Sequence, residues 1–255
     1  MIDPPPIRRL FLASRSPRRA MLLREAGFKF DRFDPPFADP ADPNEALDPG
    51  AEASPTGAGP ALAVRLAELK ARSVPSDAIP PDAVLLCADT LGVAPTGGLI
   101  GTPETAEQAL AMLRELVGRT HAIVTGVALR TADGAEPCSF ADTATVNVGQ
   151  IDETTLQTYV DTGGWRGKAG AYNLAERLGA GWPITVAGDP GTVMGLPMRR
   201  LTAQLVELGV PQAPGPDPGM TLGTAREEIA PAPGLSIQPS PGSGAGAEGG
   251  AHESP

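Results

Sequence analysis

The chain has 255 residues, and its 30 acidic and 20 basic side chains give a formal net charge of −10. This balance disfavours general nucleic-acid binding, because there is no basic field to attract a phosphate backbone. No stretch of the sequence approaches the roughly 18 apolar residues that span a bilayer, and the first residues lack a signal-peptide pattern. We therefore expect a cytoplasmic protein that binds neither nucleic acid nor a membrane.

Glycine and proline, with 31 and 29 residues, are concentrated in two segments. Residues 34–60 form a run of Asp, Pro, Ala and Gly with little apolar periodicity, which we interpret as an insert. Residues 210–255 cannot bury enough apolar surface to offset the entropy of ordering them, so we expect a disordered C-terminal tail. The predicted domain therefore covers residues 1–209, which is long enough for one substantial core.

The first predicted elements are a strand at Leu10–Ala13 and a helix from Pro17 to Ala26. Ser16 is a good N-cap for this helix, and proline suits the first helical position because its missing N–H needs no partner there. The N–H groups of the first turn and the side chains of Arg18 and Arg19 would then form an anion site, with phosphate as the anion. The alternative is an ordinary helix whose two arginines are solvated.

The next elements are a helix at Ala61–Ser73 and an apolar strand at Val84–Ala88, which we expect to be buried on both faces. Asp89 follows where this strand ends, at the sheet edge where open α/β folds bind ligands. A carboxylate there could hold a divalent metal ion or deprotonate a water molecule for attack on phosphorus. The alternative is an aspartate that caps its own turn through Thr90.

The rest of the domain alternates between strands and helices without an internal repeat. We predict short strands at 91–94 and 99–100, a helix opened by Thr102–Pro103, a hairpin of Ile123–Arg130 and Cys138–Val148, a helix over Asp152–Val160 and a last helix from Pro197. This order predicts an α/β fold, with a mixed twisted sheet flanked by helices.

Other side chains that could carry chemistry are few. Lys168 lies in the glycine-rich loop Gly167–Gly170, which suits phosphate binding but lacks P-loop spacing, and a solvated lysine is the alternative. Lys70 at a helix end could simply complement the helix dipole. Cys87 and Cys138 look like buried free thiols, with a disulfide as the less favoured alternative, and zinc-ligand spacing is missing. The residues alone describe a phosphate-ester site and leave its reaction open.

Six short motifs give information on the reaction that the spacing of single residues does not. They are LASRSPRR (12–19), LAELKA (66–71), CADT (87–90), GRTHAIVTG (118–126), GKAGAY (167–172) and GLP (195–197), in this order. Together they resemble the Maf family of nucleoside triphosphate pyrophosphatases, also described as septum-formation inhibitors, over about residues 8–209 without the insert. The resemblance implies a fold like that of Maf and inosine triphosphatase. It also implies hydrolysis of a nucleoside triphosphate between the α- and β-phosphates, assisted by Mg²⁺ or Mn²⁺.

The resemblance also implies roles for individual residues. It makes Asp89 the catalytic residue, as general base or metal ligand, and it ties Thr90 to the choice of substrate. Its phosphate-binding positions match Ser14, Arg18, Arg19, Lys70 and Lys168. A homodimer is a possible assembly. The alternative function is a catalytically weak nucleotide-binding regulator of cell division.

The chain departs from the family pattern at three places. Asp39-Pro40 stands where the family often has Asp-Glu, and Gly101-Thr102-Pro103 stands where many members have Gly-Lys-Pro. Ala175 replaces the glutamine of the pyrimidine-selective branch, so we expect the neighbouring Glu176 to bind the base, unless it points into solvent. A carboxylate there would favour the donor edge of guanine over thymine or uracil.

Overall fold

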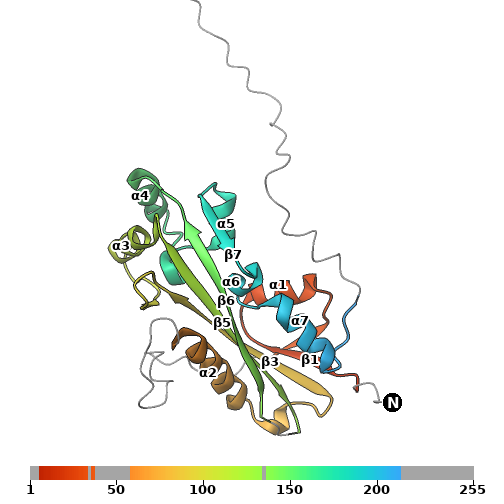
Figure 1. Cartoon of the computed structure of the whole chain (residues 1–255). Helices are drawn as coiled ribbons and strands as arrows, with labels where there is room; N and C mark the ends of the chain where they lie inside the picture. The colour runs from red at the N-terminus through yellow and green to blue at the C-terminus, as the bar shows by residue number, and fades with distance from the viewer. Residues whose placement is uncertain (1–5, 34–35, 38–57, 134–135, 214–255) are drawn as a thin grey trace, which may run out of the picture. The chain divides into compact units, whose positions relative to one another are not determined.

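The computed structural model describes residues 6–33, 36–37, 58–133 and 136–213. These residues contain a seven-stranded sheet with the order β2-β1-β3-β5-β6-β7, and β4 pairs with β3 (Figure 1). β1 is parallel to β2 and to β3, and the other pairs are antiparallel, so the sheet is mixed. The strands are β1 (Arg9–Ala13), β2 (Phe30–Phe33), β3 (Ala83–Val93), β4 (Leu99–Ile100), β5 (Thr120–Thr131), β6 (Cys138–Val148) and β7 (Ile184–Ala187).

Helices cover both faces of this sheet, α2 on one and α1, α6 and α7 on the other (Figure 1). Two short 3₁₀ turns, η2 and η3, lie at Ser76–Ala78 and Ala169–Ala171. The helices are α1 (Pro17–Glu25), α2 (Ala58–Ser73), α3 (Ala106–Leu116), α4 (Glu153–Asp161), α5 (Leu174–Gly179), α6 (Pro190–Met194) and α7 (Met198–Glu207). The expected α/β architecture is therefore confirmed.

The alternation of side chains along β3 divides the core between the two faces. Leu85 and Cys87 pack with α2, whereas Leu86 and Ala88 pack with α1 and α7. Because successive side chains of a strand point to opposite faces, Asp89 lies on the α2 face and the next residue on the α1 face. This alternation places the side chains of Asp89 and Thr90 on opposite faces of the sheet.

Helix α2 approaches the sheet very closely at one glycine. A Cβ atom on Gly126 would lie 2.1 Å from the carbonyl carbon of Ala63 in α2. Gly126 is also the register partner of Asp89 across the β3–β5 pair. The glycine therefore lets α2 lie directly over the strand that carries this carboxylate.

Several sequence predictions need correction. β3 continues through Asp89 to Val93, so the strand does not end before Asp89 as predicted, because β5 pairs with it along this whole stretch. Strands β2 and β7 and helices α5 and α6 were not predicted. Both cysteines are free, and Cys87 is buried as predicted, but Cys138 is exposed at the start of β6, where its side chain reaches Gln204. Burial raises the pKa of Cys87 to about 12.

The predicted insert at 34–60 ends too late, because residues 58–60 form the first turn of α2. Most of the rest of the insert lies outside the described residues, as does the tail from residue 214 on, so these parts stay predictions. Residues 210–213, which we assigned to the tail, contact the domain. Val210 is only 2% exposed and packs in the core with α1 and α7. The N–H of Ala213 donates to the carbonyl of Gly27 at 3.0 Å. Packing on the domain therefore extends past residue 209.

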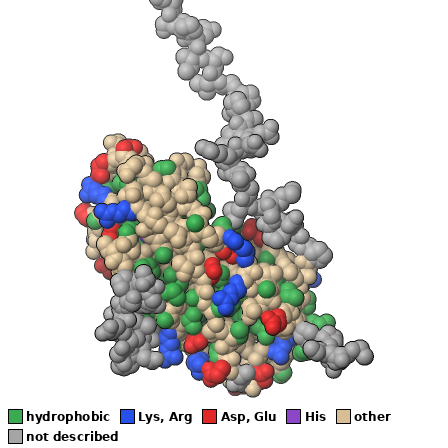
Figure 2. Space-filling view, viewed as in Figure 1, with side chains coloured by type: hydrophobic (Ala, Val, Ile, Leu, Met, Phe, Trp, Pro, Cys, Tyr) green, Lys and Arg blue, Asp and Glu red, His purple; other side chains and the backbone are tan. Residues whose placement is uncertain are grey.

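None of the helices in the described ranges is both long enough and apolar enough to cross a membrane. On the face that Figure 2 shows, lysine and arginine side chains alternate with acidic ones and do not gather into one basic surface. The cytoplasmic location and the homodimer stay predictions.

Candidate active site at a gap in the sheet

One edge of β3 has a gap in its pairing. β1 pairs with β3 as far as Leu86, and β4 pairs only with Gly92 and Val93. Along residues 87–91, which we call the β3 gap, no described strand covers this edge. Asp89 and Thr90 lie in the gap and point to opposite faces of the sheet. A ligand at this edge can therefore reach side chains from both faces.

Helix α1 supplies the first wall of the β3 gap. Ser16 is its N-cap, and the hydroxyl of Ser16 accepts a hydrogen bond from the N–H of Arg19, as predicted, with Pro17 in the first turn. The hydroxyl of Ser14, which follows β1, accepts from the N–H of Ser16 at 3.2 Å. Arg18 is exposed. The turn between β1 and α1 therefore places polar groups beside the gap.

The guanidinium of Arg19 is held by three hydrogen bonds. Its Nη1 donates to the Ser14 hydroxyl at 3.2 Å, and its Nη2 donates to the Thr90 hydroxyl at 3.1 Å. Its Nε donates to the carbonyl oxygen of Gly195 at 2.9 Å. Gly195 ends α6 with a φ of +106°, and a Cβ atom there would lie 3.0 Å from the Arg19 Nε. Glycine is therefore the residue that permits this approach.

Helix α2 supplies a second wall on the opposite face. The ammonium of Lys70 forms an ion pair with the carboxylate of Asp89, and their side chains are 14% and 12% exposed. The Lys70 Nζ also lies 5.5 Å from the centre of the Phe37 ring. A buried charge is costly unless it is paired, so each partner stabilises the other. The pair combines a carboxylate that can accept a proton from water with a cation that can bind a phosphate oxygen.

Lys168 lies on a separate segment that is joined to β4. The N–H of Gly170 donates to the carbonyl of Gly101 at 3.0 Å, just after β4 ends. The Lys168 Nζ lies 2.5 Å from the carboxylate of Glu176. Within the described residues, no hydrogen bond or ion pair links Lys168 directly to Asp89.

Glu176 lies in the first turn of the short helix α5. Its backbone N–H is capped by Asn173, and its carboxylate pairs with Lys168. Base binding by Glu176 would require this ion pair with Lys168 to open, and the selection of a guanine base stays a prediction.

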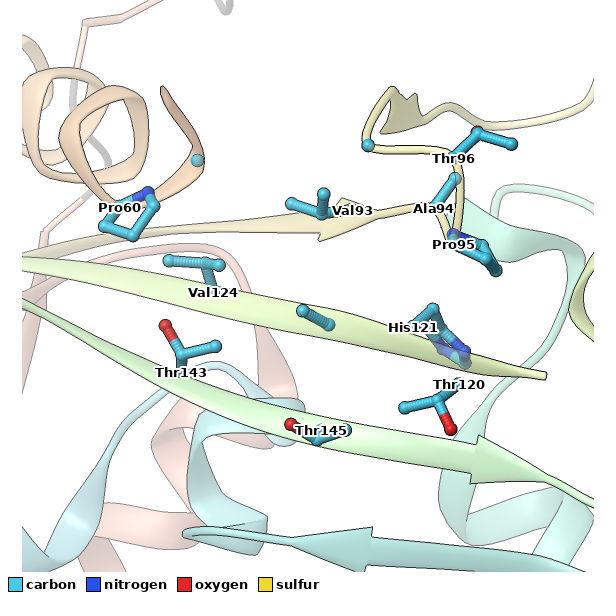
Figure 3. A pocket seen from close by; sticks show the side chains of 13 residues that line it. Pro60, Val93, Ala94, Pro95, Thr96, Thr120, His121, Val124, Thr143 and Thr145 are labelled. Atoms are coloured by element: carbon cyan, nitrogen blue, oxygen red, sulfur yellow. The ribbon is translucent and has the colours of Figure 1, made fainter. Parts of the chain in front are cut away.

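A cavity of about 360 Å³ lies on the α2 face, beyond the N-terminal end of that helix. Figure 3 shows Pro60 above it and Val93, Val124, Thr143 and Thr145 along its floor. None of the candidate site residues lines this cavity. The contacts around the β3 gap, and not this cavity, therefore define the candidate site.

Two buried polar residues of the segment 118–126 were not predicted from the sequence. Thr125 is 0% exposed and bonds to the Thr90 hydroxyl. His121 is 3% exposed, and its Nε2 lies 3.0 Å from the hydroxyl of Tyr172. Burial lowers the pKa of His121 to about 4 and raises the pKa of Tyr172. The signal in the sequence that could have identified them is a polar residue within the otherwise apolar strand β5.

Comparisons with known proteins agree with the resemblance. The family model described as Maf-like protein matches residues 9–208. A dTTP/UTP pyrophosphatase from Salinibacter ruber is 37% identical over 75% of this chain and 87% of its own length. A dTTP/UTP pyrophosphatase from Symbiobacterium thermophilum is 35% identical over 80% of this chain and 96% of its own.

Proposed function

The chain belongs to the Maf-like protein family, and on that premise we propose that it hydrolyses nucleoside triphosphates to a nucleoside monophosphate and pyrophosphate. The named activity of its relatives supports this proposal, since they are dTTP/UTP pyrophosphatases that match most of the chain. We extend the proposal to dTTP and UTP as the substrates. The names of the relatives support dTTP and UTP, whereas binding of a guanine base by Glu176 would require its ion pair with Lys168 to open.

The observation that carries the proposal is the Lys70–Asp89 ion pair at the β3 gap. Arg19 reaches the same stretch of β3 from the other face through its bond to Thr90. Two cations and a carboxylate thus meet at one sheet edge. This is what attack of water on a phosphoric anhydride requires, because the cations neutralise the phosphates and the carboxylate activates the water.

In this mechanism the carboxylate of Asp89 accepts a proton from a water molecule, whose oxygen attacks the α-phosphorus. The bond between the α-phosphorus and the bridging oxygen breaks, and pyrophosphate leaves with that oxygen. Lys70 moves from Asp89 toward a phosphate oxygen as the substrate binds, so its charge stabilises the developing negative charge. Arg19 and Arg18 hold phosphate oxygens from the α1 side.

The single carboxylate of Asp89 fits a divalent metal ion that takes most of its other ligands from the phosphates of the substrate and from water. Within the described ranges no group of three or more His, Cys, Asp or Glu side chains is placed to hold a metal ion. Mg²⁺ is commonly held by one or two carboxylates together with phosphate oxygens and water. In its alternative role as a metal ligand, Asp89 would hold Mg²⁺ or Mn²⁺ here. Bound there, the ion would neutralise charge on the phosphates.

The test is turnover of a panel of dTTP, UTP and GTP by the full chain with Mg²⁺, with pyrophosphate and orthophosphate separated. We expect pyrophosphate as the product and dTTP and UTP as the better substrates. Asp89→Asn is expected to lower kcat by two to four orders of magnitude, a range typical of a lost acid/base group. Asp31→Asn is the matched control, since Asp31 is an exposed carboxylate paired with Arg9. Nucleotide binding without turnover would instead support a regulator.

Two of the three arginines in the segment 12–19, Arg15 and Arg18, allow a second comparison. Arg18 lies in the first turn of α1, whereas Arg15 precedes the N-cap. We expect Arg18→Ala to raise KM more than Arg15→Ala does, because only the first-turn arginine adds to the anion site. Equal, small effects would show that Arg18 does not bind the phosphates.

A further inference from the structure

A chain of hydrogen bonds runs from Arg19 through the sheet. The Thr90 hydroxyl lies 3.1 Å from the Arg19 Nη2 and 2.9 Å from the Thr125 hydroxyl. The Thr125 hydroxyl in turn lies 2.8 Å from the carbonyl oxygen of Thr192 in α6. Thr125 and Thr192 are both 0% exposed, so water does not compete for these bonds. The side chain of Arg19 is therefore connected to a buried backbone carbonyl through two hydroxyls.

The direction of each bond in this chain is fixed. A guanidinium can only donate, and a carbonyl oxygen can only accept. Thr125 must therefore give its one hydroxyl hydrogen to the Thr192 carbonyl. Thr90 must then give its own hydrogen to Thr125 and accept from Arg19. One arrangement of hydrogens satisfies every group, so the chain has a single low-energy state.

Both the last acceptor in this series of hydrogen bonds and the acceptor of the Arg19 Nε belong to helix α6. Thr192 lies in α6, and Gly195, whose carbonyl accepts from the Arg19 Nε, ends the same helix. The hydroxyl of Thr192 is itself bonded to the carboxylate of Asp142 on β6. Arg19 is thus tied to α6 twice, directly and through the two hydroxyls. Together with the bond to Ser14, these contacts fix the plane of the guanidinium.

We propose that Thr125 is a positioning residue for Arg19. Acting through Thr90, it holds the Arg19 guanidinium in the orientation that binds the phosphates of the substrate. Thr125 lies on β5 as the register partner of Thr90 and is 0% exposed, so it would act on the substrate only through Thr90 and Arg19. This inference rests on the proposed function, because that function assigns Arg19 to the phosphates.

The variant that isolates this role is Thr125→Val. Valine keeps the shape of threonine but removes the hydroxyl, so Thr90 loses its acceptor and can turn away from Arg19. We expect the KM for dTTP to rise about tenfold, which corresponds to about 1.4 kcal/mol, the loss of one good hydrogen bond. We expect kcat to change less. Thr125→Ser restores the hydroxyl and is expected to bring KM back to within about twofold of the wild type.

A double-mutant cycle separates positioning from a general packing defect. If Thr125 acts through Arg19, Thr125→Val has no further effect on affinity in an Arg19→Ala background. An equal loss of affinity in both backgrounds would overturn the inference. If Thr125→Val does not fold, Thr90→Val breaks the same chain at a half-buried residue and enters the cycle in its place.

Affinity in the cycle is measured by calorimetry with α,β-imido-dUTP, which is not cleaved, and with inorganic pyrophosphate. This readout does not depend on turnover, so the inference and the proposed function fail in different ways. A wild type that binds the analogue but hydrolyses nothing would contradict the proposed function alone. A Thr125→Val variant that binds both ligands as the wild type does would contradict the inference alone.

Discussion

Acidification is predicted to destabilise the protein through one histidine. His121 is 3% exposed on β5, and burial lowers its pKa from 6.5 to about 4. Its Nε2 bonds to Tyr172, and its Nδ1 is buried with no partner among the described residues, so the native state favours the neutral ring. The unfolded chain binds a proton at about pH 6.5, and the folded protein binds it only near pH 4. Stability is therefore complete above pH 6.5 and falls as the pH drops toward 4.

The two pKa values differ by about 2.5, and each pKa unit corresponds to about 1.4 kcal/mol, so the full loss is about 3–4 kcal/mol. The assay is urea denaturation at a series of pH values between 7.5 and 4.5, with His121→Gln as the comparison. Glutamine can replace Nε2 as the partner of Tyr172 but does not titrate. We expect the free energy of unfolding to fall less steeply with acid in the variant. Parallel curves for the two proteins would refute the reasoning.

Two predictions concern packing. Gly126→Ala places a methyl group 2.1 Å from the backbone of α2, so we expect a loss of 1–3 kcal/mol or more in urea denaturation, whereas Gly98→Ala, with nothing within 4 Å, is expected to cost little. Truncation after Gly209 removes Val210, which is 2% exposed, and is expected to lower stability by about 2 kcal/mol relative to truncation after Ala213. Equal melting temperatures of the two truncated chains would show that Val210 contributes nothing to the core.

Local signals in the sequence were sufficient for some elements. Ser16 and Pro17 identify the start of α1 because capping depends on groups within one turn. Strands β2 and β7 have only four residues each, which is too short for a period-two pattern to be distinguished from a loop. Elements with strong local patterns were therefore predicted correctly, whereas the short edge strands were not predicted.

The site depends on contacts between distant parts of the chain. β3 continues past Ala88 because β5 pairs with it there, although aspartate disfavours strands when considered alone. The Lys70–Asp89 pair and the bond from Thr90 to Thr125 join residues on different elements. The sequence identified most candidate residues individually, but it could not show that Asp89 and Thr90 face opposite sides of one gap.

The central claim is that water attacks the α-phosphorus of a nucleoside triphosphate at the β3 gap. Hydrolysis of dTTP in ¹⁸O-labelled water, followed by mass spectrometry of both products, tests it most directly. The account predicts ¹⁸O in dTMP and none in pyrophosphate, with the labelled product lost in Asp89→Asn. Label in pyrophosphate or orthophosphate, with dTMP unlabelled, would contradict it.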